Sequence, residues 1–580
     1  MQVALGNSPA DLVILNGQVV NVFSREIYPG GIAIRGAKIA AVGDVAYAVG
    51  KETKVIDAGG RFLTPGLVDG HVHVESSTLN ITRFAGLALR HGTTSIMSDL
   101  HEVAVVGGLS ALQEVLNEGN RLPFKVYFVV PSHVPFSPGF ETTGGVIGPA
   151  EVATAVRFPR SVGLSEVVVT FALNEEARLW KAMDIIRSAG QTLHGHCPFT
   201  KGAQLSAFAS LGIRTDHESF DFDDGIQRLR AGIHLQIRHG SAAESIPDLI
   251  RIVTEKGLDS RHISIITDDY LAEDLLSKGY MDAIVRKLIK HGVDPVTAIQ
   301  ITSLNAAEAY RVDHAIGVLA PGREADILLV DDLEDFNVHQ VISRGILVAE
   351  DEQTIGAFPE PSPSPAQMNS VHVARPITPA DLEQAVGKAA GQDKVRVNTL
   401  VIPPEIPVPD LGIFEVNVQN GIPQPQPEND MAVICVVERH KATGNIAVAF
   451  AKGFHLKKGA MASSVAHDHH NIIAIGTNYR DLARSVNRVI ELQGGQVIVC
   501  DGVVTAEVPL PILGLMSLAP AEEVCQQANR LTAAAREIGC DLRWPLMFLS
   551  FVSCSSGPGY SITDKGFLDG YHQRFIPVIA

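Results

Sequence analysis

Eight short apolar segments recur between about Leu67 and Leu304, most of them separated by stretches with helical periodicity. The intervening stretches carry apolar residues at the i, i+3 and i+4 spacing of amphipathic helices. Eight strand-and-helix units within a segment near ~250 residues favour a closed (β/α)8 TIM-like barrel of the α/β class. An open doubly wound sheet is the alternative, but no GxGxxG turn supports it. The apolar segments are LVDGHVH, TTSIMSD, KVYFVVPS, VGLSEVVV, TLHGHCP, IRTDHES, HLQIRHG and SIITDDY.

The rest of the chain predicts further folding units, because 580 residues exceed the ~250–300 that one hydrophobic core supports. Alternating apolar and polar residues at 11–58 and again at 317–349 indicate strands on both sides of the barrel segment. The dipeptides Asn16-Gly17 and Arg35-Gly36 predict hairpin turns in the first of these stretches. We therefore expect a composite small β-sandwich domain (1–64 plus 315–355), the barrel (65–314), a proline-rich linker (356–369) and a C-terminal α+β domain (370–580).

Composition excludes several classes of partner. The chain carries 47 Lys and Arg against 64 Asp and Glu, a formal net charge of −17, which disfavours nucleic acid and anionic membrane surfaces. No apolar run approaches the ~20 residues of a membrane span, and the N-terminus has no secretory signal pattern. Six scattered cysteines without a CxxC pair are typical of a reduced, cytoplasmic protein.

Histidines and carboxylates stand where the predicted strands end, which is where barrel enzymes place their active sites. His71 and His73 are two residues apart on an extended segment, so they point the same way and can bind one metal. Burying four imidazoles and two carboxylates at one rim is costly, and a pair of divalent cations would remove that cost. The strand-end residues are His71, His73, Glu166, His196, His217 and Asp268.

Longer motifs around these positions carry a resemblance to a known family. The segment PGLVDGHVHVESS (65–77), followed much later by GVLAPGREADILLV (317–330), resembles the amidohydrolase superfamily. Within that superfamily, the segments HVHVESS, SDLHEV, GLSEV, GHCP, DHES and TDD resemble bacterial adenine deaminases. The segments SSVAHDHHNIIAIGTN (463–478) and ITDKG (562–566) resemble the C-terminal domain of the same family.

The resemblance implies a binuclear metal centre and deamination of adenine to hypoxanthine and ammonia. Glu166 would bridge the ions where many relatives use a carboxylated lysine. The ions would be Mn²⁺ or Fe²⁺, with Zn²⁺ also possible. We also expect a homo-oligomer, specifically a homodimer. His71, His73 and Asp268 would bind the first metal, and His196 and His217 the second.

The chemistry of adenine defines roles for neighbouring acids. Metal binding lowers the pKa of water from ~15.7 to about 7, which supplies a hydroxide to attack C6. Asp268 is the candidate to take the water proton and pass it to the departing ammonia, and a second acid should protonate the ring. We expect the catalytic set to be Asp268, Glu75 and Glu102, and the substrate-binding set to be Asp99, His101 and Glu218.

Other hypotheses remain open for some of these residues. Glu75, Glu102 and Glu218 could instead orient a metal-bound histidine, and Asp99 with His101 could form an additional cation site. Cys197 lacks a paired base and indicates buried packing rather than a nucleophile.

Two questions concern larger parts of the chain. The segment from His467 to Asn471 is either a polar turn or a contribution of His467, Asp468 or His470 to the barrel mouth. Alternatives for the whole chain are cyclic amide hydrolysis by a related amidohydrolase and a noncatalytic relative.

Overall fold

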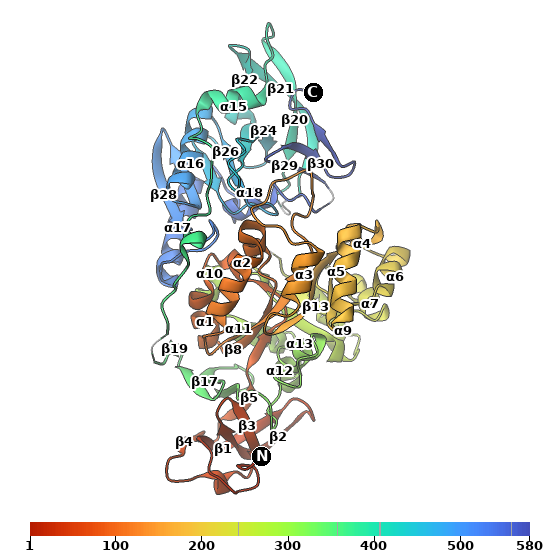
Figure 1. Ribbon diagram of the computed structural model, residues 1–580, viewed down its shortest axis with the longest axis vertical. Coiled ribbons are helices and arrows are strands. Elements are labelled where there is room, and N and C mark those ends of the chain that lie inside the picture. The colour runs from red at the N-terminus through yellow and green to blue at the C-terminus, as the bar shows by residue number, and fades with distance from the viewer. Residues whose placement is uncertain (242, 357, 405–407, 558) are drawn as a thin grey trace.

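The computed structural model describes residues 1–241, 243–356, 358–404, 408–557 and 559–580. Figure 1 shows three parts arranged along the long axis, with the two chain ends at opposite ends of the molecule. A small sheet domain lies at the N-terminal end, the barrel lies in the middle, and the third part lies beyond the barrel. No helix in the described ranges is long and apolar enough to cross a membrane.

The small domain is one nine-stranded sheet built from both sides of the barrel segment. Strand β16 pairs antiparallel with β5, placing Ile327 opposite Pro65. Side chains from the two chain segments share one core, in which Ile14, Leu63 and Ile342 are fully buried. The strands are β1 (Leu12–Asn21), β2 (Glu26–Arg35), β3 (Lys38–Gly43), β4 (Lys54–Asp57), β5 (Phe62–Pro65), β16 (Ile327–Val330), β17 (Val338–Ser343), β18 (Ile346–Glu350) and β19 (Gln353–Thr354).

The predicted hairpin turn at Asn16-Gly17 is wrong. Strand β1 runs through this dipeptide and stays paired with β2 on both sides of it, with a shift in register between Ile14 and Gly17. Asn16 has a φ of 57°, the left-handed conformation that asparagine tolerates. The dipeptide therefore forms a bulge within one strand instead of reversing the chain. The chain does reverse at Arg35-Gly36, between β2 and β3.

All eight predicted strands of the barrel are present, and they run parallel in chain order. The first and last strands each continue into a short extension, and these extensions pair with Asp268 opposite Val72. This pairing joins the two edges of the sheet and closes it into a ring. The strands are β6 (Leu67–Asp69) with β7 (Val72–His73), β8 (Thr93–Ser98), β9 (Lys125–Pro131), β10 (Ser161–Val168), β11 (Thr192–His196), β12 (Ile213–Asp216), β13 (His234–Arg238) and β14 (Ile263–Ile266) with β15 (Asp268–Asp269).

Helices cover the outside of the ring with their apolar faces. Helix α1 begins after Asn80, whose side chain accepts a hydrogen bond from the backbone N–H of Arg83, and it buries Phe84 and Leu87. The helices are α1 (Ile81–Arg90), α2 (His101–Gly119), α3 (Pro149–Ala155), α4 (Val169–Leu173), α5 (Ala177–Ser188), α6 (Gly202–Ser210), α7 (Phe222–Arg230), α8 (Ile246–Leu249), α9 (Arg251–Thr254), α10 (Ala272–Ser277), α11 (Met281–Lys290), α12 (Pro295–Ile301) and α13 (Leu304–Ala309). Short 3₁₀ turns occur in all three parts of the chain. They are η1 (Ala46–Ala48) in the small domain, η2 (Val74–Ser77) and η3 (Ser260–His262) in the barrel, and η4 (Pro427–Asn429) in the third part.

The third part is a nine-stranded sheet between two pairs of helices, with a small three-stranded sheet beside it. Helices α15 and α16 pack on one face of the large sheet, and α17 and α18 pack on the other. The helices are α14 (Pro365–Met368), α15 (Pro379–Val386), α16 (Tyr479–Glu491), α17 (Ala521–Glu537) and α18 (Pro545–Phe551). The strands are β20 (Lys394–Val401), β21 (Asp410–Gln419), β22 (Ile422–Pro423), β23 (Ala432–Val437), β24 (Ile446–Lys452), β25 (Ala460–Ser463), β26 (Ile472–Gly476), β27 (Gly495–Cys500), β28 (Val503–Pro509), β29 (Tyr560–Thr563), β30 (Gly566–Asp569) and β31 (Arg574–Ile576).

Contacts from two directions fix this part against the barrel. The start of α17 packs into the barrel's own core through Val524 and Cys525. The loop after β9 reaches in the other direction, where Thr142 donates hydrogen bonds from its backbone N–H and its hydroxyl to the Asp564 carboxylate. The Phe140 ring lies 5.3 Å from that of Phe575. The C-terminal part is therefore held beside the barrel mouth (Figure 1).

Candidate metal centre

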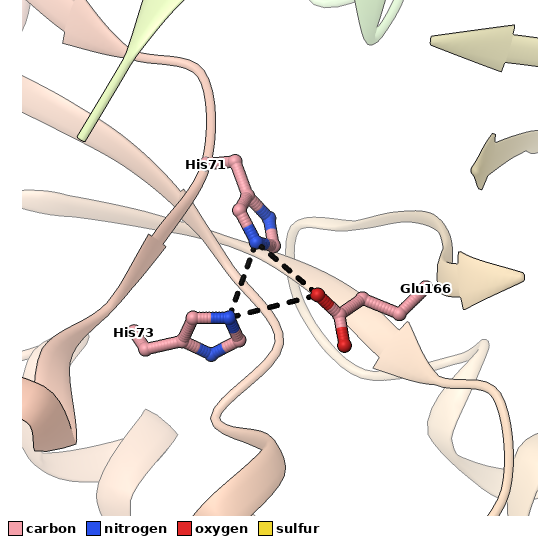
Figure 2. Close-up of side chains that lie close together, drawn as sticks. All are labelled: His71, His73 and Glu166. Carbon is pink, nitrogen blue, oxygen red and sulfur yellow. Dashed lines mark hydrogen bonds and ion pairs between the residues drawn. The ribbon is translucent and has the colours of Figure 1, made fainter. Parts of the chain in front are cut away.

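The first strand and the fourth strand bring three side chains together at the barrel mouth. Nε2 of His71 lies 3.3 Å from Nε2 of His73. Oε1 of Glu166 lies 3.7 Å from each of these nitrogens. Figure 2 shows the three side chains pointing at one another. His73 lies in β7, His71 directly precedes that strand, and Glu166 lies in β10.

Glu166 also faces the fifth and sixth strands. Its Oε1 lies 3.6 Å from Nδ1 of His196 and 3.7 Å from Nε2 of His217. One carboxylate oxygen is thus almost equidistant from four imidazoles. Asp268 completes the group, with Oδ1 lying 3.3 Å from Nε2 of His73. The structure brings together all six residues that the sequence predicts as ligands.

The spacing of these atoms fits divalent ions. Ligand atoms held ~2.1 Å from one ion at tetrahedral angles lie about 3.4 Å apart, which is close to the separations observed here. Nδ1 of His196 and Nε2 of His217 are buried and have no hydrogen-bond partner among the described residues. Buried polar atoms are normally paired, so unpaired imidazole nitrogens on converging side chains are what a cation site requires.

The backbone is held in an unusual conformation at two of the six positions. Glu166 has a φ of 48° and Asp268 a φ of 61°, both in the left-handed region. Such conformations cost of order 1–3 kcal/mol for residues other than glycine, and they concentrate at functional sites. Here they turn carboxylates at the strand ends toward the imidazoles.

Electrostatics keep Asp268 ionised. Burial alone would raise the pKa of Asp268, but Arg238 and the neighbouring histidines hold this pKa well below its usual range. Burial disfavours protonation of His217, and with the nearby His71 it lowers the pKa of His217 well below its usual value. An ionised carboxylate beside a neutral imidazole is the state in which both groups can bind a metal.

Arg238 is a residue of the site that the sequence did not single out. It is the last residue of β13, and its Nη2 lies 2.6 Å from Oδ2 of Asp268. The same nitrogen donates to Oε1 of Glu218. Arg238 is a charged residue at the end of the seventh predicted strand. The rule that active-site residues lie at strand ends, which identified the six ligands, would also have identified it.

Asp69 is a second residue that the sequence did not single out. Its carboxylate accepts hydrogen bonds from Thr267 Oγ1, Tyr280 Oη and the backbone N–H of His71. Burial raises the pKa of Asp69 to about 6. These contacts tie the first strand to the last, and so fix the positions of His71 and Asp268.

The predicted substrate-binding residues Asp99, His101 and Glu218, and the predicted catalytic Glu102, lie on two sides of the six ligands. Asp99 Oδ1 lies 3.3 Å from His73 Nδ1, and Glu102 Oε2 lies 3.5 Å from the same nitrogen. The ring of His101 stacks on Phe136, with 4.5 Å between ring centroids. Glu218 lies on the other side, with Oε1 3.4 Å from Nε2 of His217. Asp99, Glu102 and Glu218 therefore contact the imidazoles directly.

Glu75 is held differently from these three. Its Oε1 accepts a hydrogen bond from the backbone N–H of Val103, while its Oε2 has no partner in the described part of the chain. Burial and the nearby Glu102 raise the pKa of Glu75 well above its usual range.

The histidine-rich segment of the C-terminal part contributes one side chain to this region. Nε2 of His467 lies 3.6 Å from Oε1 of Glu102, and its Nδ1 lies 3.0 Å from Ser550 Oγ. Asp468 instead accepts hydrogen bonds from the backbone N–H groups of Ser555 and Ser556. The buried His470 packs within its own segment, where its Nδ1 accepts from the backbone N–H of Ala466.

Cys197 is buried beside Asp216 and Arg228, and burial raises the pKa of its thiol. A protonated, buried thiol is a packing group, as the sequence indicates.

Comparison with known proteins identifies the family. Residues 62–348 match the amidohydrolase family model, and residues 409–574 match the model of the adenine deaminase C-terminal domain. The chain is 38% identical to adenine deaminase 4 of Rhizobium meliloti (strain 1021) over 99% of this chain and 96% of that protein. It is 39% identical to adenine deaminase of Moorella thermoacetica over 100% of this chain and 97% of that protein. The chain belongs to the adenine deaminase family.

Membership in the adenine deaminase family covers all three parts of the chain, because these relatives align over nearly its whole length. Among solved structures, a beta-aspartyl dipeptidase from Fervidobacterium islandicum AW-1 aligns with 60% of this chain and 99% of its own, at 19% identity and a TM-score of 0.47. The domain that matches the adenine deaminase C-terminal model contains His467, the residue that reaches the barrel mouth.

Proposed function

We propose that this chain hydrolyses adenine to hypoxanthine and ammonia at the metal centre. The observation that carries the proposal is the convergence of six potential ligands, with four imidazoles around Oε1 of Glu166, in a chain similar over its full length to adenine deaminases. The two relatives named above are both adenine deaminases that align over nearly the whole chain, which favours adenine over the cyclic amides of the alternative reaction.

Two divalent ions fit the arrangement of the side chains. His71, His73 and Asp268 would hold one ion, and His196 and His217 the other, with Glu166 between them. Imidazole and carboxylate ligands suit Mn²⁺ and Fe²⁺, and they also suit Zn²⁺. When bound, such ions lower the pKa of water to about 7 and act as Lewis acids.

Asp268 is the group to which we assign transfer of a proton from the attacking water. The reaction forms a bond between the water oxygen and C6 of adenine and breaks the bond between C6 and the amino nitrogen. Asp268 would accept a proton from the water and deliver it to the amino nitrogen, which leaves as ammonia. Arg238 orients the carboxylate for both transfers through its contact with Oδ2.

Glu75 is the better placed acid for the purine ring. When C6 becomes tetrahedral, N1 gains a proton from the acid and keeps it in hypoxanthine, and the second proton of the attacking water restores the acid. Both oxygens of Glu102 face histidines, His73 on one side and His467 on the other. Glu75 makes no such contact with a histidine in the described part of the chain, and its Oε2 has no hydrogen-bond partner there. We therefore assign ring protonation to Glu75 and the orientation of His73 to Glu102 and Asp99.

The direct test is ammonia release from adenine by the purified chain supplied with Mn²⁺, Fe²⁺ or Zn²⁺. We expect turnover with adenine, loss of turnover after chelation, and recovery with two ions per chain. Ring opening of a dihydropyrimidine is measured in parallel. Ring opening without ammonia release from adenine would contradict the proposed function and favour cyclic amide hydrolysis.

A further inference from the structure

A pocket lies between the barrel mouth and the C-terminal domain. Its barrel side is lined by Glu75, Ser76 and Asp269. Its other side is lined by His467 and by side chains from β28, α17 and α18, including Val508, Leu531, Met547 and Phe551. The pocket is thus polar at the barrel and mainly apolar at the C-terminal domain.

The polar end of the pocket adjoins the metal centre. Asp269 directly follows Asp268 in β15, and Glu75 stands two residues beyond His73. Glu102 links the metal centre to the opposite wall of the pocket, because it lies between His73 and the pocket residue His467. A molecule in the pocket could therefore present one edge to the metal centre while the rest of it contacts the C-terminal domain.

The apolar end suits the faces of a flat aromatic ring. Leu531 comes from α17, and Met547 and Phe551 come from α18, so two helices form this wall. The ring of Phe551 packs against that of His467, with 4.7 Å between centroids. Ligand pockets typically combine apolar and aromatic walls with a few polar groups that fix orientation. A purine has two apolar faces and a polar edge, and it matches both kinds of wall.

The polar end also contains an unsatisfied group. Glu75 is only 2% exposed, and its Oε2 has no hydrogen-bond partner within the described residues. Leaving a buried polar atom unpaired is unfavourable. A ring nitrogen of a base bound in the pocket would provide the missing partner.

We infer that this pocket binds the purine ring, with the edge of its six-membered ring at Glu75 and its faces against α17 and α18. The C-terminal domain is then a substrate-binding element that determines the affinity for adenine. This inference rests on the proposed deamination, and it adds the site and the domain that recognise the substrate.

Two alanines of α17 provide a matched test. Ala528 lines the pocket, whereas Ala533 is exposed on the same helix. A phenyl group at 528 would fill the pocket, so Ala528→Phe should raise KM for adenine at least tenfold while both ions stay bound. Ala533→Phe makes the same chemical change toward solvent and should leave KM and kcat unchanged.

Tryptophan fluorescence provides a second measurement that does not depend on turnover. The chain has two tryptophans: Trp544 lines the pocket, and Trp180 lies on α5 of the barrel. Hypoxanthine, the product of the proposed reaction, should change the emission of a Trp180→Phe variant in a saturable way. It should leave the emission of a Trp544→Phe variant unchanged.

The possible outcomes separate the inference from the proposed function. An unaltered KM in folded, metal-loaded Ala528→Phe would overturn the pocket while leaving deamination intact. A Trp180→Phe variant that deaminates adenine but gives no fluorescence change with hypoxanthine would do the same, and it decides the matter if Ala528→Phe fails to fold. A wild-type chain that releases no ammonia from adenine would refute both.

Discussion

Replacing Arg238 by alanine removes the cation that two buried carboxylates share. Its guanidinium lies 2.6 Å from Asp268 and also contacts Glu218, whose side chains are 7% and 6% exposed. At 2.6 Å and an effective dielectric constant of ~20, the Coulomb attraction is about 6 kcal/mol. Breaking buried ion pairs typically costs ~3–5 kcal/mol. Bound metal ions would compensate part of the lost charge, so we take about 3 kcal/mol as the expected loss.

Counted entirely as lost transition-state stabilisation, about 3 kcal/mol corresponds to a roughly 150-fold fall in kcat/KM, at ~1.36 kcal/mol per factor of ten. We expect it mainly in kcat, because in the proposed reaction Arg238 orients Asp268 for proton transfer, and Arg238 does not line the pocket described above. Arg238→Lys should lose about tenfold, since an ammonium group lacks the planar fork that serves two carboxylates. Guanidine added to the alanine variant should restore part of the activity.

The assay is ammonia release from adenine, with the metal content of each variant measured by elemental analysis. Arg261→Ala is the matched control, because Arg261 pairs with Glu308 away from the metal centre. It should retain wild-type kcat. Two results would refute the reasoning: an Arg238→Ala enzyme with both ions bound and kcat within threefold of wild type, or a loss of activity that guanidine leaves unchanged.

Three further substitutions test other parts of the structure. Asp268→Asn should abolish ammonia release while the protein retains much of its metal; normal turnover would disprove proton transfer by Asp268. Glu166→Gln should lower the metal content below two ions per chain and lower Tm in the presence of Mn²⁺, because Oε1 faces all four imidazoles; an unchanged stoichiometry by elemental analysis would contradict its bridging position. Burial and Asp468 raise the pKa of Glu141 from 4.5 to about 8. The folded state therefore binds a proton that the unfolded state releases, and Glu141 should destabilise the fold progressively as pH rises from 4.5 to 8. Glu141→Gln should therefore show a Tm advantage over wild type that grows across that range in thermal melts, and a constant difference would refute the assignment.

The sequence by itself determined the barrel and its six converging side chains. Strand and helix patterns repeat with periods of about 2 and 3.6 residues, so local periodicity defines each βα unit without knowledge of the others. Parallel strands in a closed barrel place all their carboxyl ends at one rim. Strand-end position was therefore sufficient to bring residues as far apart as His71 and Asp268 together.

Only the tertiary structure decided which neighbours these side chains have. The sequence shows Arg238 as a charged residue at a strand end. Its ion pairs with Asp268 and Glu218 depend on side-chain geometry across three strands. His467 reaches Glu102 because two large surfaces pack together, and no periodic pattern in the chain encodes that docking. The sequence likewise did not show whether Asn16-Gly17 forms a turn or a bulge, because this depends on β2 pairing with β1 on both sides of the dipeptide. Local patterns specify elements, whereas contacts between distant surfaces form only when those elements are packed.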